Sequence, residues 1–390
     1  MKNSKLMMML PTILTGGIAV VVGFVSSVAI LFQAASAAGA TPAQTSSWIF
    51  AVCLGAGLVS IIFSLYYRIP ILAAWSTPGA ALLSVSLLNT PMSETVGAFL
   101  FCGLLMIIAG VTGWFEKAVR RIPVPLASAM LAGILLKFGM DVFTSMKAEP
   151  FLVIAMLLVY FIGKRMFPRY AVIGVFVVGT LIAGFAGSLH FENVGFTFAE
   201  PQFVMPTFSW SVLIGVGIPL FVVTMASQNL PGVIILRSAG YHPRISPIIT
   251  GTGVATFLLA PFGAFSVNFA AITAAICAGP EAHKDPSQRY IASVSAGVIY
   301  LFVALMSSAI IALLSAFPKE LVLSLGGIAL FATIANGLLS AMKEDRSREA
   351  AVITFLVTAS GISLFGIGAA FWGLVAGVIA MIATQPKKVD

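Results

Sequence analysis

The most constraining feature of this sequence is a succession of apolar stretches separated by proline, glycine or charged residues. About fourteen such stretches can be counted along its 390 residues. A membrane-spanning helix needs about 20 apolar residues, so fourteen spans leave only short connections. The chain is 59% hydrophobic and 9% charged, whereas soluble domains are about 25% charged. This composition excludes an ordinary soluble enzyme, a nucleic-acid-binding protein and a disordered scaffold.

The positions of the basic residues test this count independently. With the N-terminus in the cytoplasm, alternation places all but three of the 21 Lys and Arg residues on the cytoplasmic side, and the three are Lys137, Lys147 and Lys319. Because basic residues favour cytoplasmic loops, we expect a multi-pass membrane protein with both termini in the cytoplasm. The apolar run 6–32 is longer than a signal-peptide core, so we expect it to be retained. The expected spans are approximately 11–32, 45–66, 70–88, 94–115, 123–139, 150–163, 171–188, 208–229, 244–260, 262–279, 290–315, 320–339, 350–365 and 368–385.

The two halves of the chain resemble each other. At an offset of 195 residues Gln33 corresponds to Gln228, and at an offset of 190 Ser76 corresponds to Ser266. These matches predict an all-α polytopic membrane protein with fourteen segments in a seven-plus-seven repeat. Because seven is odd, the second copy is inverted in the membrane, which is a common design of secondary transporters.

The third and tenth spans differ from the others. Pro70 and Pro78 disfavour helix before them, so we expect an extended strand and then a half-helix that starts at Thr77, with its hydroxyl as N-cap. In the tenth span Asn268 is expected to cap a half-helix that runs to about Gly279. Two half-helices that start near the membrane midplane would direct free N–H groups at one point, which favours an anion. Two ordinary proline-kinked helices are the alternative.

The side chains near that point are neutral and suit a small carboxylate with an aromatic body, although helix packing is the alternative for each of them. The polar candidates are Ser26, Ser27, Gln33, Ser76, Thr77, Gln228, Asn229, Ser266 and Asn268, and the aromatic ones are Trp75, Phe265 and Phe269. No Asp, Glu or His occupies a span centre. Glu281 and His283 are therefore the nearest proton-coupling candidates, with a solvated loop and helix cap as the alternative. The three cysteines lie in apolar runs without metal or redox spacing, so neither a metal nor a cofactor is expected.

At these motifs the sequence resembles the bacterial benzoate–proton symporter (BenE) family. The matching stretches are Ala74–Ala81, Val223–Asn229 with Pro231 and Gly232, Pro261–Gly263 to Gly279–His283, and Leu356–Gly361 leading into Phe371–Gly373. This family is distantly similar to uracil-transporter and sulfate-permease-like proteins. The resemblance implies a protein of the bacterial inner membrane. It also implies a core domain (1–118 and 201–316) paired with a gate domain (119–200 and 317–390), and a homodimer as one possible assembly.

The resemblance also implies that substrate binds between the two half-helices and faces spans one and eight. It points to Ser76, Thr77, Gly79, Gln228, Asn229, Ser266 and Asn268. Nucleobase-transporting relatives carry acidic residues near the site on spans eight and ten. This chain has Gln228 and Asn229 on span eight and no acid inside span ten, which argues against a nucleobase and leaves the proton carrier unassigned.

The sequence therefore predicts proton-coupled import of benzoate or a similar aromatic carboxylate by alternating access. Another small anion or a nucleobase on the same fold is the alternative, and a passive anion channel is a further one. An intramembrane enzyme would need a Ser–His pair, paired aspartates or metal ligands at membrane depth. Because the spans lack them, we expect no catalytic residue. The expected partners are the carboxylate, protons and membrane lipid, and no nucleic acid.

Overall fold

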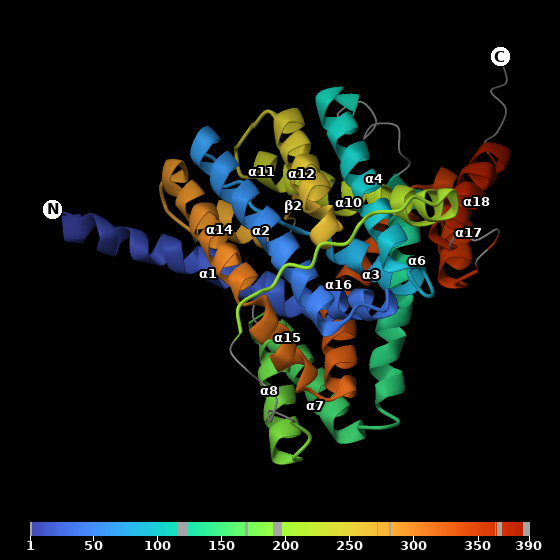
Figure 1. Ribbon diagram of the computed structural model, residues 1–390, viewed down its shortest axis with the longest axis horizontal. Coiled ribbons are helices and arrows are strands. Elements are labelled where there is room, and N and C mark those ends of the chain that lie inside the picture. Colours follow the sequence, from blue (N-terminus) through green and yellow to red (C-terminus); the bar gives the residue numbers. More distant parts are fainter. Residues whose placement is uncertain are drawn as a thin grey trace.

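The structure is mostly helical, and a two-stranded sheet lies near its middle (Figure 1). This computed structural model describes residues 2–114, 124–167, 171–189, 197–270, 272–280, 282–362, 364 and 369–384. Within these ranges seven helices are long and apolar enough to cross a membrane, and an eighth qualifies if Met9–Phe24 and Ser27–Ala37 count as one span. The chain is therefore a multi-pass membrane protein, as predicted. The number of fourteen spans stays a prediction.

One set of helices packs around the sheet. Its members are α1 (Lys2–Ala37), α2 (Pro42–Tyr67), α3 (Thr77–Ser86), α4 (Met92–Val111), α12 (Ile245–Leu259), α13 (Ile272–Ala278), α14 (Tyr290–Leu305) and α15 (Ser307–Ser315). Within this set α12 packs along α4, and α14 packs along α2 and α1. The helix α2 begins at a capping box, in which the Thr41 hydroxyl and the Gln44 side chain each accept the other residue's backbone N–H. These bonds satisfy amides that the helix itself cannot pair.

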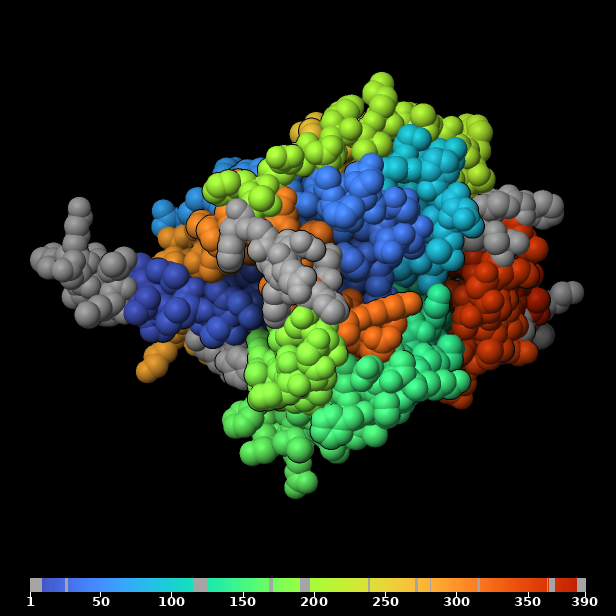
Figure 2. All heavy atoms as spheres, turned by 60° about the horizontal axis from the view of Figure 1, so that its bottom comes forward, coloured from blue at the N-terminus to red at the C-terminus, as the bar shows by residue number. Residues whose placement is uncertain are grey.

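A second set of helices packs mainly against itself. Its members are α6 (Val124–Ser145), α7 (Pro150–Met166), α8 (Ala171–Phe185), α16 (Lys319–Met342), α17 (Arg348–Ala359) and α18 (Ala369–Thr384). Here α16 packs along α6, α17 contacts α18 and α6, and α7 pairs with α8. Figure 2 shows α7 and α8, in green, as a lobe below the blue helices of the first set. A glycine permits the close approach of α16 to α6, because Gly327 of α16 lies directly against the Phe138 carbonyl of α6.

The segment that corresponds to the expected eighth span is a helix with two widened turns. It consists of α9 (Trp210–Val212), the π-helical η2 (Leu213–Gly217), α10 (Ile218–Thr224), the π-helical η3 (Met225–Asn229) and α11 (Leu230–Ser238). Pro219 follows η2 and Pro231 follows η3. A proline has no N–H to donate and its ring displaces the carbonyl one turn earlier, so the preceding turn widens. Such π-turns are frequent at functional sites, and η3 carries Gln228 and Asn229.

The third and tenth segments are each a short strand followed by a short helix, as expected. Strand β1 (Ala73–Trp75) precedes α3, strand β2 (Val267–Phe269) precedes α13, and the two strands are antiparallel with Ala74 opposite Asn268. Two details of the prediction are wrong. Ser76, not Thr77, is the N-cap of α3, because its hydroxyl accepts the Gly79 N–H at 3.0 Å. Asn268 lies in the middle of β2 and caps no helix, because α13 starts only at Ile272.

Short 3₁₀ turns connect several of these helices. They are η4 (Ala260–Phe262) before β2, η5 (Pro286–Gln288) before α14 and η6 (Asp345–Ser347) before α17. The expected eleventh span is divided at Met306 into α14 and α15. Strand β2 contacts α2 and α12, and α13 contacts α14.

Candidate functional site

The two buried strands are held by hydroxyl groups on the helices that flank them. From α2, the Ser60 hydroxyl accepts the Ala73 N–H of β1 at 2.9 Å. From α12, the Thr256 hydroxyl accepts the Val267 N–H of β2 at 2.8 Å. Non-helical backbone at membrane depth must find its hydrogen bonds inside the protein. The strands can therefore lie where they do because α2 and α12 supply the partners that a water shell would supply elsewhere.

Two asparagines connect the broken segments to each other. The Asn229 Oδ1 of η3 accepts the Phe269 N–H of β2 at 2.9 Å. With its amide oriented to match its neighbours, Asn268 accepts the Ser76 N–H at 2.9 Å and donates to the Phe269 carbonyl at 2.8 Å. Both asparagines are fully buried. Their hydrogen bonds fix the relative positions of β1, β2 and η3, which form the floor of the site.

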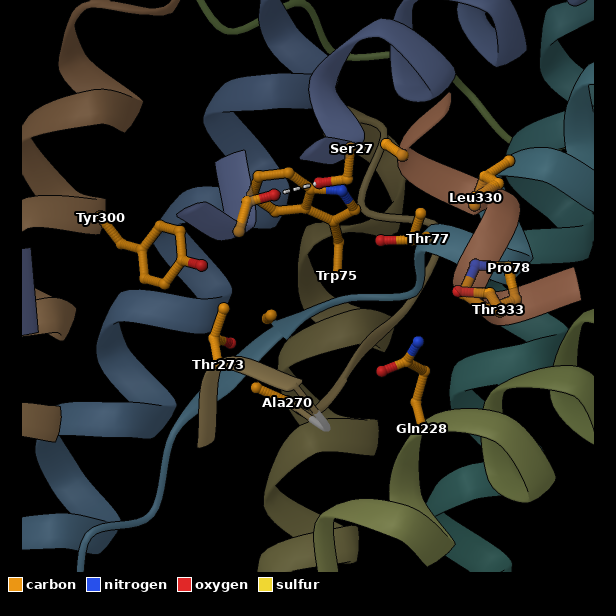
Figure 3. Close-up of a pocket in the computed structure, with 13 residues that line it drawn as sticks. Ser27, Trp75, Thr77, Pro78, Gln228, Ala270, Thr273, Tyr300, Leu330 and Thr333 are labelled. Atoms are coloured by element: carbon orange, nitrogen blue, oxygen red, sulfur yellow. Dashed lines mark hydrogen bonds between the residues drawn. The ribbon is translucent and has the colours of Figure 1, made fainter. Parts of the chain in front are cut away.

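A cavity of about 90 Å³ lies beside this floor (Figure 3). It is lined by Gly23 and Ser27 of α1, Ala74 and Trp75 of β1, Thr77 and Pro78 of α3, Gln228 of η3, Ala270, Thr273 of α13, Tyr300 of α14, and Ala329, Leu330 and Thr333 of α16. None of these lining residues carries a charge. Six wall residues come from helices of the first set, four from β1, η3 and Ala270, and three from α16, so the cavity lies where the first set and the broken segments meet the second set.

Trp75 is the most informative residue of the wall. Its side chain is 3% exposed, and its indole N–H is buried without a hydrogen-bond partner in the described part of the chain. The ring is held edge-on by Phe24 at 5.6 Å and by Tyr300 at 6.0 Å between ring centroids. A buried donor without a partner costs about 1–3 kcal/mol. Such a group in a cavity wall is suited to an acceptor that arrives with a ligand.

The first turn of α3 adds a backbone donor. The Gly79 N–H is taken by the Ser76 hydroxyl, the Ala80 N–H by the Ser76 carbonyl, and Pro78 has no N–H. Among the described contacts this leaves the Thr77 N–H as the unpaired amide of the turn. Thr77 also lines the cavity with its side chain. At the positive end of the α3 dipole, the Thr77 N–H is therefore the donor that remains available to a ligand.

The structure brings four of the twelve predicted site residues to the cavity wall: Ser27, Trp75, Thr77 and Gln228. The others lie behind the wall or elsewhere. Ser76, Gly79, Asn229, Ser266, Asn268 and Phe269 form the buried support, Phe265 packs with Trp48 and Phe99, and Gln33 lines a separate cavity. The side chain of Ser26 lies outside the described residues. Their roles in binding stay predictions.

Several wall residues were not singled out from the sequence. The polar ones are Thr273, Tyr300 and Thr333. Thr273 lies in the first turn of α13. The expected half-helix in the tenth span was therefore the signal that could have found it. Tyr300 and Thr333 lie inside long apolar spans, and nothing local distinguishes them. Only packing of α14 and α16 against the broken segments brings them to the cavity.

Of the two proton-coupling candidates, His283 lies in the loop after α13. Glu281 is outside the described residues. The His283 Nδ1 accepts the Asp285 N–H at 3.0 Å, and the buried Arg289 holds the loop by donating to the carbonyls of His283 at 2.8 Å and Ala278 at 2.9 Å. The backbone N–H and hydroxyl of Ser287 donate to Asp285 and hold the pKa of its carboxyl below the usual value. Asp285 is therefore an ionised cap of η5.

Comparison with known proteins gives consistent matches along the whole chain. The family model of BenE, benzoate membrane transport protein, matches residues 7–383. The chain is 46% identical over 372 residues to the inner membrane protein YdcO of Escherichia coli (strain K12), covering 95% of each. It is 36% identical over 375 residues to a benzoate membrane transport protein of Acinetobacter baylyi (strain ATCC 33305 / BD413 / ADP1), covering 96% of this chain and 95% of the relative.

Solved structures with a similar fold are more distant in sequence. SLC26A9 aligns with a TM-score of 0.64 and 15% identity over 96% of this chain, which spans 65% of that protein. The transmembrane domain of the cyanobacterium bicarbonate transporter BicA aligns with a TM-score of 0.59 and 13% identity, over 94% of this chain and 97% of that domain. At such identities the likeness concerns the fold alone.

Proposed function

Because the chain belongs to the BenE family of benzoate membrane transport proteins, we propose that it imports benzoate or a similar aromatic carboxylate together with protons, by alternating access. The observation that carries this proposal is the uncharged cavity at the broken segments, where neutral donors and aromatic rings share one wall. We assign the carboxylate to the Thr77 N–H, the Trp75 indole N–H and the Gln228 amide. The substrate ring would lie toward Tyr300.

The size of the cavity supports an alternating mechanism. An apolar cavity that takes up benzene measures roughly 150 Å³, whereas this one measures about 90 Å³. An aromatic ring therefore enters only when the walls separate. Ala329, Leu330 and Thr333 come from α16, and the rest come from the first helix set and the broken segments, so a displacement of the second helix set against these elements would open the site.

We further propose that the chain crosses the membrane fourteen times as an inverted seven-plus-seven repeat, with both termini in the cytoplasm. The core domain would comprise 1–118 and 201–316, and the gate domain 119–200 and 317–390. The preference of α16 for α6 and of α14 for α2 supports this division. The two strand–helix segments, one in each half, support the repeat.

Coupling to protons has a clear energetic reason. Import of an anion against an inside-negative potential costs about 2.3 kcal/mol per 100 mV, and one accompanying proton removes this cost. No titratable acid or histidine lines the cavity among the described residues, so we keep Glu281 and His283 as the carrier candidates. A carrier variant, Glu281→Gln or His283→Ala, should lose accumulation driven by a pH gradient but retain benzoate exchange, which needs no net proton movement. Asp285→Asn is the matched control and should keep both activities.

The experiment that tests the function is uptake of radiolabelled benzoate into proteoliposomes with an acidic exterior. We expect saturable accumulation that a protonophore abolishes. Uptake that ignores the pH gradient would refute symport, absence of uptake would refute the substrate, and equilibration without accumulation would indicate a passive channel. Competition by other aromatic carboxylates, bicarbonate and uracil would separate the proposed substrate from another anion or a nucleobase.

A further inference from the structure

A second and larger cavity, of about 660 Å³, lies between the two helix sets. The first set contributes α1 and α3 to its wall, and the second contributes α6 and α16. Its polar wall consists of Gln33, Ser36, Ser84, Lys137, Asp141 and Lys319. The apolar wall includes the rings of Phe32, Phe138 and Phe317. A cavity lined by both cations and phenyl rings complements an aromatic carboxylate in charge and in shape.

The larger cavity lies in line with the smaller one. On α1 the wall residues move from Ser27 to Gln33, and on α3 from Thr77 to Ser84. With a rise of about 1.5 Å per residue, these separations are roughly 9–11 Å. On α16 the wall moves over the same length in the opposite chain direction, from Leu330 to Leu323. Three helices thus carry both cavities along one path.

A thin layer of packed side chains separates the two cavities on this path. A methyl group at Gly326 of α16 would lie 3.3 Å from the Gln33 Nε2 and 3.5 Å from the Ile30 Cγ1 of α1. The Gln33 Nε2 is itself buried and has no hydrogen-bond partner in the described part of the chain. We call this layer the Gly326 partition. Gln33 lies in it, and its side-chain N–H is available to a ligand.

The charges on the wall favour an anion. Lys137 and Lys319 are both close enough to interact electrostatically with Asp141, yet neither forms a direct ion pair with it among the described residues. The C-terminal end of α3 also faces this cavity, and its free carbonyls oppose an anion. Two ammonium groups outweigh these negative contributions and leave the cavity locally cationic.

We propose that this larger cavity is an outer recruitment site, where Lys137 and Lys319 hold the carboxylate of an aromatic acid before it passes the Gly326 partition. The inference rests on the proposed function, whose topology places both lysines on the outer side. A cationic cavity raises the local concentration of an anionic substrate and accelerates its entry, and salt weakens this effect. Asp141 competes with the substrate for the two ammonium groups.

The test measures KM and kcat of benzoate uptake in proteoliposomes for the double variant Lys137→Gln/Lys319→Gln. We expect KM to rise about threefold to tenfold at low ionic strength with kcat unchanged, and the difference to shrink at about 0.5 M salt. The double arginine variant should restore KM. Asp141→Asn should lower KM, which damage to packing would not do. Lys147→Gln is the matched control, because this exposed outer lysine lines neither cavity.

Unchanged KM in the double glutamine variant would overturn the recruitment site and leave the lysines as anchors at the membrane surface. An equal effect of Lys147→Gln, or a KM that rises in Asp141→Asn, would overturn it as well. These results require wild-type protein that transports benzoate. A wild type without uptake would instead refute the proposed function itself, so the two failures are distinguishable.

Discussion

Trp75→Phe is the substitution that tests the proposed carboxylate contact most directly. The indole N–H is buried and unpaired in the described part of the chain, so its removal breaks no hydrogen bond of the empty protein and relieves an unsatisfied donor. In the complex the same change removes a hydrogen bond to a charged group, which contributes about 1.5–3 kcal/mol. Since about 1.4 kcal/mol is a factor of ten, benzoate should bind about tenfold to 150-fold more weakly.

The stability of this variant should change little. Phenylalanine keeps an aromatic ring between Phe24 and Tyr300, and the relieved donor offsets part of the lost packing. The measurements are benzoate binding by isothermal titration calorimetry in detergent and thermal unfolding of the same sample. A neutral analogue, benzyl alcohol, should lose less affinity than benzoate in the variant, because its hydroxyl oxygen accepts only a neutral hydrogen bond.

Trp48→Phe provides the matched control. Trp48 is 2% exposed and packs against Phe99 and Phe265, with ring centroids 5.2 and 6.2 Å away, but it lines neither cavity. It should lose stability and keep its affinity for benzoate. Equal losses of affinity in both variants would mean that packing is responsible, and unchanged affinity in Trp75→Phe would refute the contact.

Further substitutions separate support from movement. Thr256→Val removes the acceptor of the Val267 N–H and should lower the free energy of unfolding by about 1–3 kcal/mol, measured as an earlier thermal transition; an unchanged transition would mean the strand finds another partner. Gly327→Ala sets a methyl group against the Phe138 carbonyl and should reduce the yield of monodisperse protein in size-exclusion chromatography. Gly326→Ala faces α1 instead and should preserve folding but lower kcat, and a wild-type kcat would contradict relative movement of the two helix sets.

The broken segments show how far local sequence carries a prediction. Pro70 and Pro78 restrict the backbone before them whatever surrounds them, and the strand and half-helix follow. The N-cap of α3 is Ser76 and not the predicted Thr77. Both residue types are good N-caps, and only the folded structure decides which hydroxyl reaches the Gly79 N–H. Asn268 is likewise a residue type that often caps helices, but it lies within β2 and pairs with Ala74 of β1.

The binding wall divides in the same way. Trp75 and Thr77 could be found because they lie close to Pro78 within their own segment, and Gln228 because it matches Gln33 at an offset of 195 residues and lies in a stretch that resembles the family. Tyr300 and Thr333 could not be found, since each sits in a long apolar helix whose rotation and depth are set by its neighbours. Gln33 corresponds to Gln228 at an offset of 195 residues, yet the two residues line different cavities, because the helix that carries Gln33 extends past the site.

The sequence by itself determined that this chain is a multi-pass membrane protein with two interrupted segments and few charges near its centre. Those features follow from transfer of apolar residues out of water and from the fixed φ of proline, which act locally. The tertiary structure alone decided which polar groups are consumed as support and which remain free. That outcome depends on hydrogen-bond geometry between segments far apart in the chain. A shift of one residue there decides whether a donor bonds to another protein group or faces the cavity.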